Sequence, residues 1–326
     1  MTSRPRDRIM DAAPPPVMVA WGAGVDSSAM IMGMVDRGER IDIVLRARMP
    51  ENPRTLAFIP IFEAWMDAHG IAHETVTTVP RHFKQAPPYF DLLEASLLNA
   101  ALPSISLGGK TCSLRWKSSP QEKWAKTWPP AQQAWARGQK VIRLIGFNNG
   151  PRDSKRYAHA GARPSDLFDT RFPLRDWGWD RDACVDRLHR AGFEVDASSC
   201  YFCIGARPRD IRLLPPANLR LIVLMEARAR PRLRTCEGLW RSTTRGIRGG
   251  EARPGSMTAF IRSEGLLDRA EIDWIEEVAT ADLADFIQSV AQFPIDARPT
   301  MHDWIERFQD QADVLGIDAE AKSLAA

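Results

Sequence analysis

A glycine-bearing turn followed by carboxyl and hydroxyl side chains is the first feature of the chain that could do chemistry. An apolar run is followed by Gly-Ala-Gly at 22–24, and Asp-Ser-Ser at 26–28 begins an amphipathic helical pattern. Glycine allows main-chain conformations that point successive N–H groups inward, and a helix N-terminus carries about half a positive charge. The pattern therefore predicts a phosphate-binding turn, with a purely structural strand-to-helix connection as the alternative.

Cysteine spacing supplies the second chemical feature. Cys200 and Cys203 form a Cys-x-x-Cys pair, the shortest spacing that lets two thiolates share one metal ion or one cluster edge. Cys112 is the best candidate for a third ligand, because Arg115 and Lys117 beside it favour the thiolate that binds metal or acts as a nucleophile. The spacing alone suits zinc as well as iron.

The apolar and helical patterns that must position these residues alternate along the chain. Apolar runs occur at 17–21, 41–45, 72–79 and 141–147, and helical patterns occur at 27–37 and 54–69. This alternation is typical of a parallel sheet with crossover helices. We expect an α/β fold with a parallel twisted sheet, helices on both faces, and a helical C-terminal region.

Composition and length indicate the organisation of the chain. The 326 residues are 44% hydrophobic, which suffices for one large domain or two smaller ones. We expect a disordered leader at 1–16, an α/β domain at 17–240, and a connection with a helical cap at 241–326. Five cysteines without a signal-like apolar segment near Met1 favour a cytoplasmic protein over a disulfide framework. No window is apolar enough to indicate a membrane span.

Positive charge is concentrated in one segment. The net charge is only +3, but residues 206–253 contain twelve arginines and four acidic residues. Such a segment forms either a solvated, acid-paired surface or a face that binds anions or nucleic acid.

The turn resembles the PP-loop of the adenine-nucleotide alpha-hydrolase superfamily, whose usual pattern is Ser-Gly-Gly-x-Asp-Ser. Gly22 stands where that serine is usual, and Ala23 replaces one glycine. The turn lacks the Gly-Lys-Ser ending of a Walker loop and the Gly-x-Gly-x-x-Gly spacing of a dinucleotide fold. Together with the segments 111–120 and 199–203, it resembles the phosphoadenosine-phosphosulfate reductase family, especially members found in phage and bacterial genomes. The match covers residues 17 to about 240 and implies a Rossmann-like PP-loop fold.

The resemblance implies a metal centre. Related sulfonucleotide reductases hold a four-iron cluster with a Cys-Cys-x-x-Arg-Lys-x-x-Pro segment and a distant Cys-x-x-Cys. Thr111 replaces the first of these cysteines here, which leaves Cys112, Cys200 and Cys203. Three ligands would leave one iron of a [4Fe-4S] cluster open, as in PP-loop sulfur transferases. Zn²⁺ is the alternative at the same three residues.

The resemblance also implies a second set of substrate-binding residues. Residues 141–146 look like the strand and turn that precede the substrate arginines of the family. Arg152, Lys155 and Arg156 therefore fall where a nucleotide phosphate or sulfate would be held. Arginine suits this role because its planar fork donates two hydrogen bonds to one oxyanion.

From these features we expect an enzyme that binds ATP, or a related adenylyl sulfonucleotide, with Mg²⁺ and activates a substrate for sulfur transfer. In this hypothesis the phosphate ligands are the amides of Gly22 to Ser28 and the hydroxyls of Ser27 and Ser28, with Gly22 and Gly24 shaping the turn. Asp26 positions magnesium or water, and Arg152 and Arg156 offset developing charge.

Two alternatives stay open at this point. A strict sulfonucleotide reductase needs a catalytic thiol, and its usual C-terminal Glu-Cys-Gly-x-His segment has only Cys236, in Thr-Cys-Glu-Gly at 235–238, as a substitute. A protein without catalysis could instead bind a nucleotide, or bind nucleic acid through the arginines of 206–253. Steep salt dependence without nucleotide turnover would favour that alternative.

Overall fold

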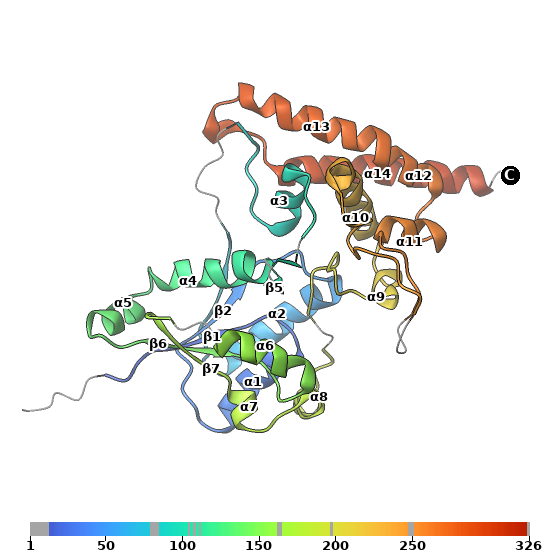
Figure 1. Ribbon diagram of the computed structural model, residues 1–326. Coiled ribbons are helices and arrows are strands. Elements are labelled where there is room, and N and C mark those ends of the chain that lie inside the picture. Colours follow the sequence, from blue (N-terminus) through green and yellow to red (C-terminus); the bar gives the residue numbers. More distant parts are fainter. Residues whose placement is uncertain are drawn as a thin grey trace, which may run out of the picture. The chain divides into compact units, whose positions relative to one another are not determined.

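The computed structural model describes residues 13–78, 85–103, 105–106, 109–110, 112–161, 165–195, 198–246 and 251–324. The chain divides into two compact units (Figure 1). Unit 1 consists of Met1–Arg46, Ile61–Glu74 and Gln121–Val195, and unit 2 consists of Ala47–Pro60, Thr75–Pro120 and Asp196–Ala326. Within the described residues, none of the helices has the length and apolar character that crossing a bilayer requires.

A five-stranded sheet forms the centre of unit 1, with the strand order β3-β2-β1-β6-β7 among the described residues. The strands are β1 (Val17–Ala20), β2 (Ile43–Ala47), β3 (His73–Val76), β6 (Val141–Ile145) and β7 (Phe168–Arg171). β1 pairs in parallel with β2 and β6, and β6 pairs in parallel with β7. The α/β expectation is therefore confirmed at the level of a parallel sheet connected by helices. β7 was not among the strands expected from the sequence.

Helices connect the strands of this sheet. Those with all or half of their residues in unit 1 are α1 (Val25–Asp36), α2 (Pro53–Ala68), α4 (Ser119–Ala125), α5 (Pro129–Ala136), α6 (Pro151–Gly161), α7 (Pro173–Asp176) and α8 (Arg181–His189). α1 packs against α8, and its methionine and isoleucine side chains at 30–32 are buried. A Cβ at Gly33 would lie 2.6 Å from the Trp177 ring, so only glycine allows this close approach. α2 continues through Pro60, where the sequence predicts a kink.

Unit 2 is mainly helical, and its core surrounds α10 (Pro216–Ala229) (Figure 1). α10 is buried over most of its circumference, which is typical of a central helix. It packs against α3 (Leu92–Asn99), α11 (Met257–Ser263) and α13 (Thr280–Ser289). The other elements that the structure describes in unit 2 are β4 (Ile105–Ser106), β5 (Gly109–Lys110), the π-helices η1 (Ser113–Ser118) and η4 (Ile275–Ala279), α9 (Pro208–Arg212), α12 (Arg269–Trp274), α14 (Met301–Leu324) and the 3₁₀ turns η2 (Arg230–Arg232), η5 (Val290–Gln292) and η6 (Ile295–Ala297).

The two units differ from the sequence-predicted division at residue 240. Segments from the expected α/β domain, including both cysteine segments, group with the C-terminal helices. The physical reason is one continuous apolar core in unit 2, which includes Met49, Trp116, Phe202 and Trp304. The C-terminal helices bury this core, so they do not form a separate cap.

Two other expectations concern irregular segments. Residues 1–12 of the expected leader lie outside the described residues, and the Pro16 carbonyl already accepts a hydrogen bond from the Ile142 amide at 3.0 Å. In the connection expected at the start of 241–326, described residues on either side of 247–250 pair with each other. Thr244 and Arg253 form an antiparallel bridge, and residues 247–250 lie outside the described part.

Candidate functional site

The turn after β1 lies where the strand order of the sheet reverses. From β1 the chain moves outward to β2 and β3, whereas β6 and β7 lie on the other side of β1. In open parallel sheets, ligands bind at the carboxyl ends of the strands at this switch point. Ala23 has a φ of +51°, in the left-handed region that favours glycine. The backbone therefore keeps a glycine-like turn where the chain has alanine.

The first amides of α1 are uncapped. The N-cap residue Gly24 has an extended backbone and contributes no side-chain hydrogen bond. The first helical hydrogen bond at this end runs from the Ser28 amide to the Gly24 carbonyl, at 3.1 Å. Among the described residues, no acceptor forms a hydrogen bond with the N–H groups of residues 23–27. Such groups at a helix start are available to an anion.

The two serines of the turn have different roles. The Ser27 hydroxyl accepts from the Gly22 amide at 3.1 Å and donates to the Gly24 carbonyl at 3.3 Å, so it braces the turn. Ser28 is fully buried, and its hydroxyl accepts from the Trp21 indole at 2.9 Å. The Ser28 hydroxyl and the Gly22 amide, both expected to contact phosphate, therefore have protein partners instead, whereas the amides of residues 23–27 are the ones that could contact an anion.

Gly146 at the end of β6 lies against the start of α1. A Cβ at this position would lie 2.8 Å from Ser27 Cα and 2.9 Å from Ser27 N. No real Cβ stands so close to backbone, so the glycine is required for the two chain segments to approach. In the sequence, Gly146 is part of the strand-and-turn pattern at 141–146. A glycine directly after a buried strand was the signal for a close backbone approach.

Asp26 in the first turn of α1 forms an ion pair that the sequence did not indicate. Its Oδ1 accepts from Arg181 Nη1 at 3.0 Å, from the start of α8. The two residues are 155 positions apart, so no spacing pattern could link them. The ion pair holds the Asp26 carboxylate in place and puts the Arg181 guanidinium beside the first turn of α1.

The predicted basic residues 152, 155 and 156 lie on α6, which follows β6. Arg156 donates to buried Asp153 at 2.9 Å and stacks over the Phe147 ring at 4.5 Å. Lys155 is exposed, and the Arg152 side chain lies outside the described part. β1 and β6 are parallel neighbours in the sheet. The turn after β1 and the segment between β6 and α6 therefore both begin at the carboxyl ends of these two strands.

The three predicted cysteines all belong to unit 2. Cys200 forms an antiparallel bridge with Glu51, and the Cys203 amide donates to the Cys200 carbonyl at 3.0 Å. Burial raises the pKa of the Cys200 thiol, and the nearby charges of Glu51, Cys203 and Cys112 raise it further, against the opposing effect of Lys117. The charges of Cys203 and Cys112 thus act on the Cys200 thiol.

Glu51 is a member of this cluster that the sequence did not indicate. Its side chain is 4% exposed, its Oε1 lies 3.6 Å from Lys117 Nζ, and its buried Oε2 has no hydrogen-bond partner among the described residues. Within that part of the chain, no three or more histidine, cysteine, aspartate or glutamate side chains stand in an arrangement that could hold a metal ion. The predicted cysteine ligands and Glu51 are therefore not arranged as a metal site in this structure.

The other cysteines lie apart from this set in sequence and environment. Cys184 on α8 is buried in unit 1, and burial, with a smaller effect of Asp26, raises the pKa of its thiol to about 12. Cys236 is partly exposed in unit 2.

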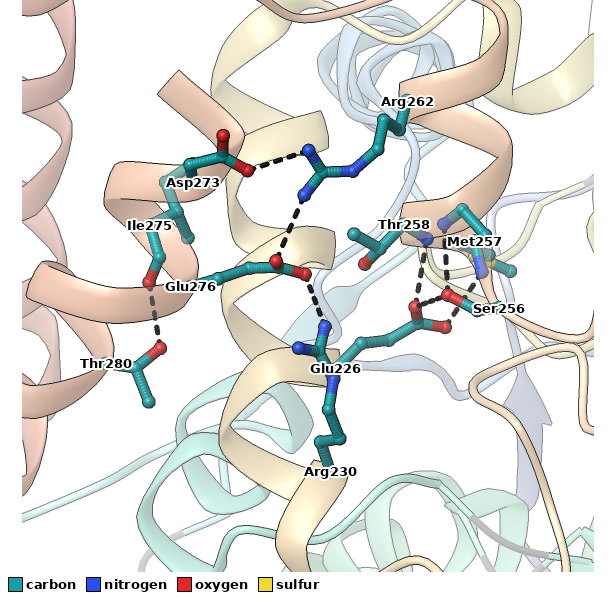
Figure 2. Close-up of polar contacts among 11 residues, drawn as sticks. Glu226, Arg230, Ser256, Met257, Thr258, Arg262, Asp273, Ile275, Glu276 and Thr280 are labelled. Carbon is teal, nitrogen blue, oxygen red and sulfur yellow. Dashed lines mark hydrogen bonds and ion pairs between the residues drawn. The ribbon is translucent and has the colours of Figure 1, made fainter. Parts of the chain in front are cut away.

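Many arginines of the basic segment are paired with carboxylates. In Figure 2, Arg230 contacts Glu276, which also accepts from Arg262 at 3.0 Å. Among the residues of 206–253 that the structure describes, the arginines with acidic partners are Arg207, Arg209, Arg212, Arg220 and Arg230. Figure 2 also shows Glu226, whose carboxylate accepts from the Ser256 hydroxyl at 2.5 Å and from two following amides. These contacts fit the acid-paired interpretation of the segment for those five arginines.

No family model matches the chain, and no curated protein matches it. A functional conclusion therefore depends on the geometry of the turn in unit 1 and of the cysteine cluster in unit 2.

Proposed function

We propose that unit 1 binds the phosphate chain of an adenine nucleotide at the start of α1, and that the protein uses the nucleotide to activate a substrate. The observation that supports this most is the set of uncapped amides at 23–27, located at the switch point between β1 and β6. Gly146 leaves the end of β6 free of side-chain bulk at this point. The proposal agrees with the PP-loop resemblance of the sequence.

The reaction class that suits this arrangement is attack on the α-phosphorus. An oxygen of the activated substrate forms a bond to the α-phosphorus while the bond to the pyrophosphate oxygen breaks, and the electron pair leaves with pyrophosphate. Fixed N–H groups stabilise the charge that develops on phosphate oxygens, because they need no reorganisation during the step. Arg156 and Lys155 on α6 add positive charge, and Arg152 is proposed to act with them.

Asp26 has a positioning role in this proposal. Arg181 fixes one carboxylate oxygen at 3.0 Å, which leaves the other for a water molecule or a hydrated cation. Mg²⁺ bound with the nucleotide would supply Lewis-acid polarisation of a phosphoryl oxygen.

The resemblance also implies a metal centre at Cys112, Cys200 and Cys203. Within the part of the chain that the structure describes, these side chains form no group that could hold a metal ion, so this centre depends on the resemblance alone, with Cys112, Cys200 and Cys203 as the residues that would hold it. An iron–sulfur centre would supply sulfur or electrons, and zinc would supply a structural clip. We include sulfur transfer in the proposal because this reaction would use both a nucleotide that activates the substrate and a centre bound by cysteines.

The decisive experiment removes one amide without removing a charge. Val25 is the first residue of α1, and Gly24 before it has φ −115° and ψ 173°, which a following proline tolerates. Val25→Pro therefore keeps the helix start and deletes one N–H group. We expect the Kd for ATP, measured by calorimetry, to rise about tenfold, which corresponds to one lost hydrogen bond to a charged group.

Val25→Ala is the matched control, because it loses buried volume but keeps the N–H group. It should bind ATP as the wild type does. If both variants bind ATP like the wild type, or if the wild type does not distinguish ATP from adenosine, the phosphate-binding proposal is wrong.

A further inference from the structure

A cavity of about 410 Å³ in unit 2 is lined by residues of η2, α11, α12 and η4. Its volume lies within the range of ordinary small-molecule sites. The polar side chains that border it include Arg230, Thr258, Arg262, Arg269 and Glu276. The proposed nucleotide chemistry of unit 1 uses none of these residues.

Ion pairs fix the orientation of one wall of the cavity. Glu276 uses both carboxylate oxygens, one for Arg230 and the other for Arg262 at 3.0 Å. Arg262 also donates to Asp273 at 2.7 Å, as Figure 2 shows. The two guanidinium groups and the two carboxylates balance in charge. Both oxygens of Glu276 are therefore occupied by protein donors.

Other guanidinium nitrogens at the cavity have no acceptor. The hydrogen bond to Glu276 uses a single nitrogen of Arg230, whose side chain is 58% exposed. Arg269 is the first residue of α12 and is exposed. Within the described part of the chain, it forms no ion pair and no side-chain hydrogen bond. Arg269 thus adds one positive charge that no carboxylate balances.

Thr258 contributes a buried hydroxyl to the same cavity. The residue is 3% exposed, and its Oγ1 has no hydrogen-bond partner among the residues that the structure describes. Its amide donates to Glu226 at 2.9 Å, which holds the residue in place at the start of α11. In Figure 2 the Thr258 side chain extends toward Arg230 and Glu276. Burying a hydroxyl without a partner is costly, and a ligand atom that hydrogen-bonds to it would remove this cost.

We propose that this cavity binds a small oxyanion, the carboxylate or phosphate monoester group of a small molecule. The unpartnered groups are the guanidinium nitrogens of Arg230 and Arg269 and the hydroxyl of Thr258, and each of them can donate a hydrogen bond. The ligand must therefore supply acceptors. Arginine suits this role because its planar fork donates two hydrogen bonds to one oxyanion.

The charge of the cavity limits the kind of anion. The ion pairs of the wall balance, so Arg269 leaves a single unbalanced positive charge. This suits a singly or doubly charged anion and not the triphosphate of ATP, which carries more negative charge. All of these residues belong to unit 2, so the inference does not depend on the nucleotide proposal for unit 1.

NMR titration of the full-length protein with inorganic phosphate, and separately with succinate, tests the site. At constant ionic strength, we expect either probe to shift the Nε resonances of Arg262 and Arg269 and the amide resonances of 257–259. A stronger response to phosphate assigns a phosphate monoester as the ligand, and a stronger response to succinate assigns a carboxylate. Absence of shifts with both probes, or shifts with ATP alone, would overturn the inference.

The same spectra keep the two proposals apart. The amides of 23–27 report on the nucleotide site of unit 1, and the resonances of Arg262 and Arg269 report on the cavity. A failure of ATP to shift the first set leaves the response of the second set to phosphate or succinate as it is.

Arg269→Gln removes the unbalanced charge and keeps an exposed polar side chain. The Kd for the probe that binds more tightly should rise about tenfold, as expected for the loss of a charged hydrogen-bond donor. Arg209→Gln is the matched control, because Arg209 is another exposed arginine of unit 2, 68% exposed, that does not border the cavity. The control should bind the probe like the wild type. Equal affinities of Arg269→Gln and the wild type would contradict the site.

Thr258→Val separates a ligand contact from a structural role. Since the Thr258 hydroxyl has no partner in the described protein, replacing it by a methyl group should keep or raise the melting temperature and weaken probe binding several-fold. Thr280→Val is the control, because the Thr280 hydroxyl donates to the Ile275 carbonyl at 2.9 Å (Figure 2). It should lower the melting temperature and leave probe binding unchanged. Wild-type affinity of Thr258→Val would show that the hydroxyl does not contact the ligand and would overturn the proposed site.

Discussion

Gly146 and Ser27 belong to segments more than a hundred residues apart, yet a Cβ on Gly146 would lie 2.8 Å from Ser27 Cα. This close approach joins the end of β6 to the first turn of α1. The candidate phosphate site is therefore shaped by backbone packing as well as by the turn after β1.

Gly146→Ala tests this relationship. The added methyl group must displace the backbone of α1, so we expect a loss of about 1–3 kcal/mol in the free energy of unfolding and weaker ATP binding. Chemical denaturation and calorimetry measure the two effects. Gly316→Ala is the control, because its Cβ would meet only an Arg220 side-chain nitrogen at 3.4 Å. Wild-type behaviour of Gly146→Ala would show that the approach is not required.

Ser28→Ala should affect stability without affecting nucleotide binding. The substitution leaves the buried Trp21 indole N–H without its acceptor, which costs about 1–3 kcal/mol. Thermal unfolding and the Trp21 contribution to fluorescence report the change. A marked loss of ATP affinity with unchanged stability would instead return Ser28 to the phosphate contacts.

Glu94 should make the stability of unit 2 depend on pH. Burial, with a smaller contribution from the charge of Asp91, raises the pKa of Glu94 from 4.5 to about 7. The folded state therefore favours the protonated form, and this stabilisation is complete below the unfolded pKa and is lost as the pH rises through about 7.

The free energy of unfolding should thus fall by up to about 3 kcal/mol between roughly pH 4.5 and 7 because of this group. Denaturant unfolding at a series of pH values measures it. Glu94→Gln should flatten this part of the profile, since glutamine does not titrate. A profile with the same slope in the variant would show that another group is responsible.

Glu271→Gln tests the buried ion pair in the helical core. Arg220 on α10 donates to Glu271 at 2.5 Å and also contacts Asp313. Removing the charge of Glu271 leaves a buried guanidinium only partly compensated, so we expect a loss of about 3–5 kcal/mol, measured by denaturant unfolding. Asp303→Asn, on the exposed face of α14, is a control that should cost far less.

The sequence predicted the parallel sheet because buried strands and amphipathic helices have different hydrophobic periods. The metal site that it predicted at Cys112 and the Cys-x-x-Cys pair stays a prediction, because the described residues form no group of three such side chains that could hold a metal ion. The division into units was not predictable in the same way. The core around α10 is formed by apolar residues from distant segments, and no local pattern indicates which distant segments share a core.

The same limit applies to the candidate sites. Arg181 reaches Asp26 across 155 positions, and Glu51 meets Cys200 through a single bridge. Both contacts are set by tertiary packing. The sequence also did not indicate that Ser28 is buried, because a serine after a glycine turn gives the same pattern whether its hydroxyl faces a ligand or the core.

The amides at the start of α1 provide the most direct test of the account. In ¹H–¹⁵N spectra of the labelled protein, titration with ATP should shift the amide resonances of residues 23–27 strongly downfield, and adenosine should not. Resonances of the arginine-rich segment 206–253 should stay in place. Unchanged amides at 23–27 with saturating ATP, or shifts confined to 206–253, would contradict phosphate binding at this helix start.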